Sequence, residues 1–271
     1  MNDLLNLKGE IAIVTGGAGQ LGSNYAKALA DAGAKVAIVD AKPREVPLVA
    51  EHAKAGRVIA VLADITNKAA VQAVYKEIIS KLGTPSILIN NAGIDAPPNA
   101  PAETTGPFEG FPESVWDAVI DSHLKGAFLM SQEFIRTVRE AKLPHASIIN
   151  ISSTYGVVTP DQSLYDFRRR KGEIFYKPVA YSVAKSGMLN FTRWLAEYGA
   201  PYGIRANTLV PGGVFNNQPE EFVVEYNRRT MLGRMAKEDE YNGAILFLSS
   251  HNASSYMTGS MIIVDGGWTA R

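Results

Sequence analysis

The residues most able to do chemistry in this chain are Tyr181 and Lys185, in the segment YSVAK. Side chains four positions apart lie on one face of a helix, roughly 5–6 Å apart at Cβ. An ammonium group beside a phenol favours the phenolate and lowers the pKa of the tyrosine from its ordinary value of about 10. Tyr181 could then act as a general base toward a substrate hydroxyl. Taken alone, this spacing is common and usually marks an exposed pair.

A glycine-rich segment near the N-terminus could bind a phosphate group. In GGAGQLG, residues 16–22, glycines recur at Gly16, Gly19 and Gly22 between an apolar strand and a helix. Glycine permits a tight turn and lets a pyrophosphate approach the backbone. The N-terminus of the helix behind it supplies free N–H groups and the positive end of a dipole. A purely structural turn is the alternative, but the position between strand and helix indicates a dinucleotide site.

Asp40 ends the next predicted strand and bears on the choice of cofactor. Its carboxylate can accept hydrogen bonds from the ribose hydroxyls of adenosine, and its charge would repel the 2′-phosphate of NADP. No Arg or Lys follows directly, because Ala41 is the next residue. We therefore predict NAD as the cofactor, with NADP less favoured but kept open by Lys42 and Arg44. An Asx turn that opens a loop is the alternative interpretation of Asp40.

Short apolar runs alternate along the chain with longer segments of helical periodicity. Strands are predicted at Ile11–Thr15, Lys35–Asp40, Val58–Leu62, Ser86–Asn90, Ser147–Ser152, Arg205–Val210 and Met261–Val264. Helices are predicted at Asn24–Ala32, Lys68–Leu82, Ser114–Ala141, Val179–Tyr198 and Glu238–Leu248. This alternation is typical of a parallel sheet covered on both faces. We predict one α/β domain over residues 1–271, a Rossmann-like doubly wound parallel sheet that binds its ligand at the carboxyl ends of the strands.

The composition argues against several classes of function. Lys+Arg and Asp+Glu both total 27, and the resulting zero net charge disfavours a nucleic-acid partner or a polybasic membrane-surface protein. No apolar run approaches the roughly 20 residues of a membrane span, and no secretory signal is evident. With four scattered histidines and no cysteine, we expect no metal site. We expect a cytoplasmic protein that acts on a small molecule.

Two segments interrupt the alternation, and both follow predicted strands. Asp95–Pro112 is rich in Pro and Gly and is predicted to be a loop. Tyr155–Pro178 carries several aromatic residues and the basic run Arg168–Lys171. If this segment overhangs the site, the run could bind a carboxylate, phosphate or sulfonate on the substrate. An exposed basic segment or a subunit contact is the alternative, which we favour.

Further motifs join these in sequence order. They are the glycine loop, Asp64, Asn90-Asn91-Ala92-Gly93, Ser152-Ser153, the Tyr181/Lys185 pair, Pro211-Gly212 and Asp265-Gly266-Gly267. Together they resemble the short-chain dehydrogenase/reductase family over nearly the whole chain. The resemblance implies a Rossmann-like single domain that uses NAD or NADP for oxidation and reduction.

The resemblance also implies roles for particular residues. Tyr181 is the general acid/base, and Lys185 binds the nicotinamide ribose and lowers the pKa of Tyr181. Ser153, rather than the competing Ser152, orients the substrate oxygen. Besides Tyr181 and Lys185, cofactor contacts are expected at Gly16, Gly19, Gln20, Leu21, Gly22, Asp40, Asp64, Ile65, Asn91, Ala92, Gly93, Pro211, Gly212 and Val214. The segment Val214–Arg234 stands where the family has its mobile substrate lid.

Some features depart from the family pattern. The glycine spacing is that of the family's extended branch, whereas chain length and the Asn-Asn-Ala-Gly motif fit the shorter branch. His123 stands where the family has an asparagine that helps hold a water near the lysine. Because histidine titrates near neutral pH, we hypothesise that His123 joins the proton relay; a helix-packing histidine is the alternative. Asn216 replaces a frequent threonine that bonds the carboxamide, which leaves that contact open.

The polar run Asn216–Gln218 in the lid favours a polyhydroxylated ligand. We predict an NAD-dependent oxidoreductase that interconverts a secondary alcohol and a ketone on a sugar, sugar acid or polyol. The alternatives are a 3-oxoacyl thioester (acyl carrier protein) reductase, which Asp40 and the zero net charge disfavour, and a non-catalytic nucleotide-binding sensor. The resemblance finally implies a homotetramer, assembled through Ser114–Ala141, Val179–Tyr198 and Met261–Val264.

Overall fold

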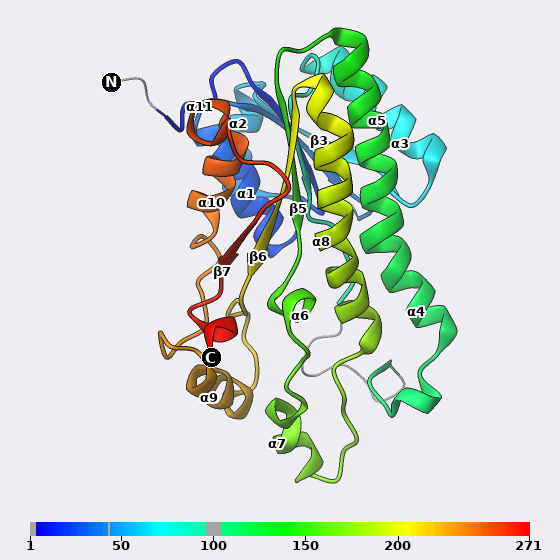
Figure 1. Cartoon of the computed structure of the whole chain (residues 1–271), viewed down its shortest axis with the longest axis vertical. Coiled ribbons are helices and arrows are strands. Elements are labelled where there is room, and N and C mark those ends of the chain that lie inside the picture. The colour runs from blue at the N-terminus through cyan, green and yellow to red at the C-terminus, as the bar shows by residue number, and fades with distance from the viewer. Residues whose placement is uncertain (1–3, 43, 96–103) are drawn as a thin grey trace.

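The centre of the molecule is a sheet of seven parallel strands (Figure 1). The structure, a computed structural model, describes residues 4–42, 44–95 and 104–271. The strands are β1 (Ile11–Thr15), β2 (Lys35–Asp40), β3 (Val58–Leu62), β4 (Ile87–Asn90), β5 (Ala146–Ile151), β6 (Ile204–Pro211) and β7 (Met261–Val264). Their order is β3-β2-β1-β4-β5-β6-β7, and all neighbouring pairs are parallel. The predicted Rossmann-like α/β domain is confirmed.

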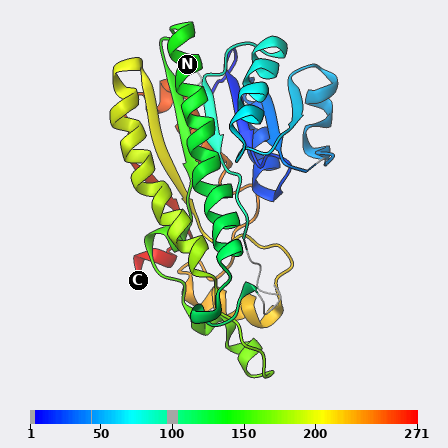
Figure 2. The ribbon, with the colours of Figure 1, turned by 90° about the vertical axis from the view of Figure 1, so that its right-hand side faces the viewer.

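Helices cover both faces of this sheet (Figures 1 and 2). They are α1 (Gln20–Asp31), α2 (Ala50–Lys54), α3 (Lys68–Lys81), α4 (Glu113–Ile120), α5 (Gly126–Ala141), α6 (Thr154–Val157), α7 (Asp166–Arg169), α8 (Val179–Gly199), α9 (Glu220–Arg229), α10 (Asn242–Ser249) and α11 (His251–Ser254). Helices α3, α5 and α8 pack on one face around Tyr75, Phe134 and Leu195. Helices α1 and α10 pack on the other around Tyr25 and Leu248. Each face of the sheet therefore has its own apolar core.

The strand order reverses between β1 and β4, and this reversal brings distant motifs together. The glycine loop follows β1, and the segment 91–93 follows β4. Ser152 and Ser153 follow β5, which pairs with β4. Because the strands are parallel, all three motifs lie at the same edge of the sheet, where a doubly wound fold binds its ligand.

Buried hydrogen bonds fix helix α8 against the sheet. Asn150 Nδ2 on β5 donates to Thr192 Oγ1 over 2.8 Å, and Thr208 Oγ1 on β6 donates to the same oxygen over 2.7 Å. Nearer the site, Ser152 Oγ donates to the carbonyl oxygen of Lys185 over 2.7 Å. These bonds hold the register of the helix that carries the Tyr/Lys pair.

Some predicted helix boundaries were wrong. Helix α1 begins at Gln20, earlier than predicted, because it starts directly behind the glycine loop. Helix α10 begins at Asn242 rather than at Glu238. Glu240 in the intervening segment pairs instead with Arg234 and accepts a backbone N–H, so the chain forms turns there.

The long helix predicted at Ser114–Ala141 is helical throughout but not uniform. Between α4 and α5, residues Asp121–Lys125 form a π-helical turn, η4. Such a turn shifts the helical register locally and is frequent at functional sites. It contains His123, the residue that departs from the family pattern.

The segment Tyr155–Pro178 is partly helical. It contains the end of α6, the 3₁₀ turn η5 (Gln162–Tyr165) and α7, and it lies with α9 at one end of the molecule (Figure 1). Of the loop predicted at Asp95–Pro112, residues 96–103 lie outside the described residues, and the remainder holds the 3₁₀ turn η3 (Phe108–Gly110). In the part of the chain that the structure describes, no helix is long and apolar enough to cross a membrane.

Candidate functional site

The expected cofactor residues gather around a cavity of about 730 Å³. Among its lining residues are Gly16, Gly19, Gln20, Leu21, Gly22, Asp40, Asp64, Ile65, Asn91, Ala92 and Gly93. The glycine loop leaves no room for side chains. A Cβ on Gly22 would lie 2.2 Å from the Gly16 carbonyl oxygen, and one on Gly16, whose φ is +61°, would lie 2.9 Å from Ala92 Cα. This bare backbone cradle at the start of α1 fits the pyrophosphate of a dinucleotide.

Asp40 lies at the far end of the same cavity. Its Oδ2 accepts a hydrogen bond from the backbone N–H of Ala18 over 3.2 Å, and its Oδ1 accepts one from that of Lys42 over 3.1 Å. Lys42 and Arg44 also line the cavity. The carboxylate is thus fixed in the cavity wall, where it favours NAD. The two nearby cations, Lys42 and Arg44, favour NADP.

Asn91 and Gly93 join the cofactor cavity to the catalytic residues. Asn91 Nδ2 donates to the carbonyl oxygens of Thr15 and Gly16 over 3.0 and 3.2 Å, which ties β4 to the glycine loop. A Cβ on Gly93 would lie 1.9 Å from Cε1 of His123. Glycine at position 93 therefore makes room for the imidazole that replaces the family's asparagine.

A second cavity of about 440 Å³ adjoins the first and shares Gln20, Leu21, Asn91 and Gly93 with it. All four residues predicted to be catalytic, Ser153, Tyr181, Lys185 and His123, line it, as do Pro211, Gly212 and Val214. Ser153 is hydrogen-bonded to Tyr181. Both serines are buried, but the Ser152 hydroxyl is donated to the backbone of α8, so the geometry favours Ser153 as the serine that meets a substrate.

Burial governs the protonation of Tyr181 and Lys185. Burial raises the pKa of Tyr181 well above its ordinary value; the carboxylate of Asp95 raises it further, and the hydrogen bond with Ser153 opposes this. The Lys185 ammonium lies 5.7 Å from the Tyr181 ring centre and donates to the carbonyl oxygen of Ile151 over 2.8 Å. The pKa of Tyr181 is thus raised overall rather than lowered, because loss of water around the phenolate is the largest contribution.

The cation of the pair, Lys185, responds to burial in the opposite direction. Burial lowers the pKa of Lys185 to about 8, although the carboxylate of Asp95 opposes the shift. An ammonium with a pKa near 8 can lose its proton within the range in which enzymes work. Lys185 is therefore itself a candidate participant in proton movement.

His123 is held as a neutral imidazole. Its Nε2 lies 2.9 Å from the carbonyl oxygen of Ile94, and because a carbonyl only accepts, Nε2 carries the hydrogen. Burial, reinforced by the charge of Lys185, lowers the pKa of His123 to about 3. The expectation that His123 titrates near neutral pH is therefore wrong. Its Nδ1 is a buried acceptor with no hydrogen-bond partner among the described residues, and its ring meets Tyr181 edge-on with centres 5.6 Å apart.

Sequence reasoning missed a charged pair in this cavity, Lys177 and Asp95. Lys177 Nζ lies 2.5 Å from Asp95 Oδ1 and 4.8 Å from the Tyr181 ring centre. A signal was present, because Lys177, Tyr181 and Lys185 are spaced four apart in the sequence. Pro178, the N-cap of α8, obscured it by separating Lys177 from the helix.

Aromatic residues from two segments form the outer wall of the cavity. Tyr155 and Tyr165 come from the 155–178 segment, and Phe222 and Tyr226 come from α9. The ring centres of Tyr165 and Phe222 lie 5.6 Å apart, within a shared apolar cluster. The substrate side of the site is therefore built by the segment after β5 and by the expected lid together.

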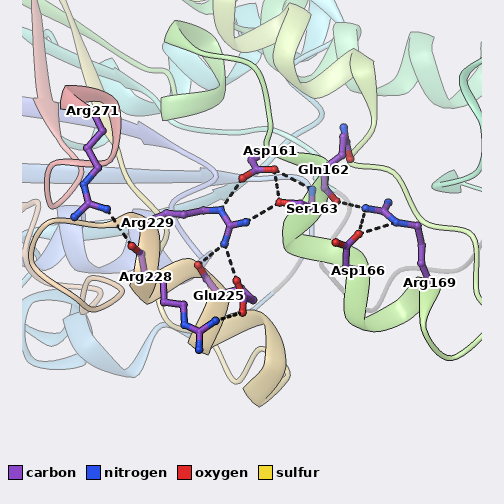
Figure 3. Close-up of polar contacts among 9 residues, drawn as sticks. All are labelled: Asp161, Gln162, Ser163, Asp166, Arg169, Glu225, Arg228, Arg229 and Arg271. Carbon is purple, nitrogen blue, oxygen red and sulfur yellow. Dashed lines mark hydrogen bonds and ion pairs between the residues drawn. The ribbon is translucent and has the colours of Figure 1, made fainter.

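Arg229 joins these two segments (Figure 3). Its Nε donates to Asp161 Oδ2 and its Nη2 to Ser163 Oγ, both over 2.6 Å. Its Nη1 donates to the backbone carbonyl of Glu225, one turn earlier in α9, over 2.8 Å. The guanidinium thus bridges α9 to the chain that leads into η5.

The basic run Arg168–Lys171 turns away from the cavity. Arg168 pairs with Glu173 over 2.6 Å, and Lys171 pairs with Glu221 over 2.9 Å. Arg169 pairs with Asp166 and donates to backbone carbonyls (Figure 3). The residues that line the cavity are others, so these cations do not meet a substrate there. Nor do the described residues contain a group of three His, Cys, Asp or Glu side chains that could hold a metal ion.

Comparisons with known proteins agree over nearly the full length. A family model described as Enoyl-(Acyl carrier protein) reductase matches residues 16–269. The D-arabinitol 2-dehydrogenase (ribulose-forming) of Scheffersomyces stipitis is 32% identical over 97% of this chain and 94% of its own. A short-chain dehydrogenase from Leptospira borgpetersenii, solved with bound NAD+, superposes with a TM-score of 0.85 at 32% identity, over 99% of this chain and 96% of its own. A gluconate 5-dehydrogenase from Burkholderia cenocepacia, solved with NADP and tartrate, gives 0.83 at 27% identity, over 99% and 98%.

Proposed function

This chain belongs to the short-chain dehydrogenase/reductase family, and from that premise we propose that it is an NAD-dependent dehydrogenase of a sugar, sugar acid or polyol. The reaction interconverts a secondary alcohol and a ketone. The observation that carries the proposal is the convergence of Ser153, Tyr181 and Lys185 on one cavity that continues into the glycine-loop groove. The names of the relatives that act on D-arabinitol and gluconate support the substrate class.

Each catalytic side chain has a distinct task in this proposal. The Ser153 hydroxyl donates a hydrogen bond to the substrate oxygen and holds it against Tyr181. The Tyr181 oxygen takes the hydroxyl proton of the alcohol, or returns it to the ketone in the reverse direction. Lys185 binds the nicotinamide ribose and stabilises the phenolate through its charge. NAD, when bound, accepts hydride from the carbinol carbon, and the protein supplies orientation and proton transfer.

His123 serves as a positioning residue. Its Nε2–H is committed to the carbonyl of Ile94, so its buried Nδ1 is free to accept a hydrogen bond. A water or a ribose hydroxyl near Lys185 is a suitable donor for it. His123 would then take part in the proton relay as a neutral acceptor, without becoming charged itself.

The preference for NAD is part of the proposal and rests on Asp40. Its carboxylate in the cavity wall accepts hydrogen bonds from ribose hydroxyls and disfavours a 2′-phosphate. Lys42 and Arg44 line the same cavity and attract that phosphate, so the preference is expected to be quantitative rather than absolute.

A 3-oxoacyl thioester (acyl carrier protein) reductase is the second candidate function. The description of the matching family model also names an acyl carrier protein, although its reaction is reduction of an enoyl group. Such an enzyme would consume NADPH and carry a basic surface for an acidic carrier protein. The zero net charge and Asp40 support the dehydrogenase instead.

We also propose a homotetramer. A groove of about 590 Å³ runs between α5 and α8 and is lined by Phe128, Trp194 and Tyr198, all of which are exposed. Exposed aromatic patches of this kind are typical of protein interfaces, and both helices were expected to form the subunit contact.

NADH formation across sugars, sugar acids, sugar phosphates and polyols, with NAD or NADP, tests the proposal. We expect turnover with at least one member, and a loss of at least about 100-fold in turnover in Tyr181→Phe. Reduction of a 3-oxoacyl thioester with NADPH, without NADH formation from any of these alcohols, would favour the second candidate. Cofactor binding without turnover on any alcohol or ketone would favour a nucleotide-binding sensor.

A further inference from the structure

The pair formed by Lys177 and Asp95 is the feature of the substrate cavity that the catalytic mechanism leaves without a task. The two residues come from distant parts of the chain, Asp95 from the segment after β4 and Lys177 from the segment before α8. The ammonium lies over the ring of Tyr181, 4.8 Å from its centre. The ammonium therefore lines the same cavity as Ser153 and Tyr181.

The two partners differ in how firmly they are held. The Lys177 side chain is 6% exposed, whereas that of Asp95 is 45% exposed. The backbone of Lys177 is also fixed, since its N–H donates to Gln162 Oε1 over 2.9 Å and its carbonyl accepts from Gln162 Nε2 over 3.4 Å. The ammonium is therefore the enclosed member of the pair, and the carboxylate of Asp95 is the member that reaches water.

The charges of the cavity leave room for one more anion. Among its described lining residues, the cations are Lys177 and Lys185 and the anion is Asp95. Lys185 donates to the carbonyl of Ile151, and the proposed function assigns it to the nicotinamide ribose. Lys177 is thus the cation left for the substrate, and the single net positive charge of these lining residues is balanced by a monoanion such as a carboxylate.

We propose that Lys177 binds the carboxylate of an acidic substrate, which replaces Asp95 on the ammonium. The inference rests on the proposed function and narrows its substrate class to sugar acids. Asp95 acts as an internal stand-in that keeps Lys177 charged and in place before the substrate enters. Asn216 lines the same cavity and can meet the hydroxyl groups of the sugar chain, whereas the Gln218 side chain is bonded to the backbone of Asn216 and Val214.

The test compares aldonates with alditols of the same configuration, such as gluconate and glucitol, which differ in one carboxylate. Binding is measured by calorimetry on the enzyme with NADH, so the readout does not depend on turnover. We expect the wild-type enzyme to bind the preferred aldonate about tenfold or more tightly than the matched alditol. Lys177→Met removes that difference and leaves the affinity for NADH unchanged. Asp95→Asn strengthens aldonate binding and not alditol binding, because the competing carboxylate is gone.

Lys171→Met is the matched control, since Lys171 is an exposed lysine of the basic run outside the cavity, and it keeps the wild-type preference. Three results would overturn the proposal. They are an equal loss of affinity for aldonate and alditol in Lys177→Met, weaker aldonate binding in Asp95→Asn, and tighter binding of a sugar phosphate than of the aldonate. If Lys177→Met does not fold, Asp95→Asn alone decides. If only neutral polyols are turned over, carboxylate binding by Lys177 is refuted and the dehydrogenase function is retained. If no alcohol is turned over, the dehydrogenase function is refuted, and the binding comparison alone tests the role of Lys177.

Discussion

At the scale of single residues, the site is governed by how little water reaches it. His123 is enclosed by the bare backbone of Gly93, the carbonyl of Ile94 and the ring of Tyr181. Its position inside a π-helical turn gives it that orientation. An enclosed imidazole of this kind can accept a hydrogen bond at a fixed point, but charging it costs free energy.

This enclosure predicts a specific sensitivity to acid. Because the pKa of His123 is about 3 in the folded chain and about 6.5 when unfolded, the unfolded chain binds more protons between these values, and stability falls as the pH drops below about 6.5. The group contributes a loss of about 1.4 kcal/mol between pH 7.5 and pH 5.5. His123→Asn should lose less stability over this interval in urea unfolding. An identical loss in both proteins would contradict the prediction.

The same residue also has a predicted effect on turnover. His123→Asn introduces the residue that the family has at this position and retains a hydrogen-bond acceptor, so turnover should be kept. His123→Ala removes the acceptor and should lower turnover about tenfold or more. The comparison of pH–rate profiles for the two variants measures this. Unchanged profiles in both would leave His123 with a packing role only.

Asp40 carries the prediction on cofactor choice. In Asp40→Ser the repulsion of the 2′-phosphate is removed while Lys42 and Arg44 remain in the cavity wall. The ratio of kcat/KM for NADP to that for NAD should rise about tenfold or more. Repulsion between the Asp40 carboxylate and the 2′-phosphate costs about 1 to 2 kcal/mol. A ratio that does not change would show that Asp40 does not face the ribose.

At the scale of elements, the substrate wall depends on two segments that are remote in sequence. Helix α9 and the chain around η5 share an apolar cluster and the Arg229 bridge (Figure 3). Because the side chains on both segments line one cavity, any displacement of α9 changes the shape that a substrate meets. The cofactor groove is built from other elements and does not depend on this bridge.

Arg229→Ala should therefore raise the KM for the alcohol substrate about fivefold, equivalent to about 1 kcal/mol, with no change in the affinity for NAD. Steady-state kinetics and calorimetry measure the two quantities. Arg228→Ala is the control, because Arg228 is 70% exposed and its ion pair with Glu225 stays within α9. If both variants behave alike, the bridge does not hold the wall.

At the scale of the whole molecule, the groove between α5 and α8 is the surface most suited to a second subunit. Trp194 is 58% exposed and stacks on Tyr198 with ring centres 5.1 Å apart. Together with Phe128 it forms an apolar strip that runs along two long helices. We expect light scattering of the wild-type protein to give the mass of a tetramer.

Trp194→Glu should reduce that mass, because a carboxylate in an apolar interface loses its hydration without gaining a partner. Leu62→Glu, at the end of β3 on the opposite edge of the sheet, should leave the mass unchanged, although Leu62 is 63% exposed. A monomeric wild-type protein, or an unchanged mass in Trp194→Glu, would contradict the proposed assembly.

The sequence alone predicted the parallel sheet and nearly all strand positions. Short continuous apolar runs such as IAIVT and SIINIS are typical of strands buried on both faces of a parallel sheet, and the strands lie at these runs. Helix boundaries were less predictable, because they depend on side-chain contacts such as that of Glu240 with Arg234, between residues whose pairing no local pattern indicates. The family was likewise visible in the sequence, because its motifs recur in a fixed order.

Only the tertiary structure decided the electrostatics of the site. A spacing of four places Lys185 beside Tyr181, but the pKa of the phenol depends on water excluded by many distant residues, and burial reversed the expected direction. Arg168, Arg169 and Lys171 of the prominent basic run pair with carboxylates outside the cavity, whereas Lys177, which no motif singled out, lines it. Composition and spacing determine which elements form and which groups are available. Desolvation and the pairing of charges arise from contacts across the whole chain, and those exist only once it is folded.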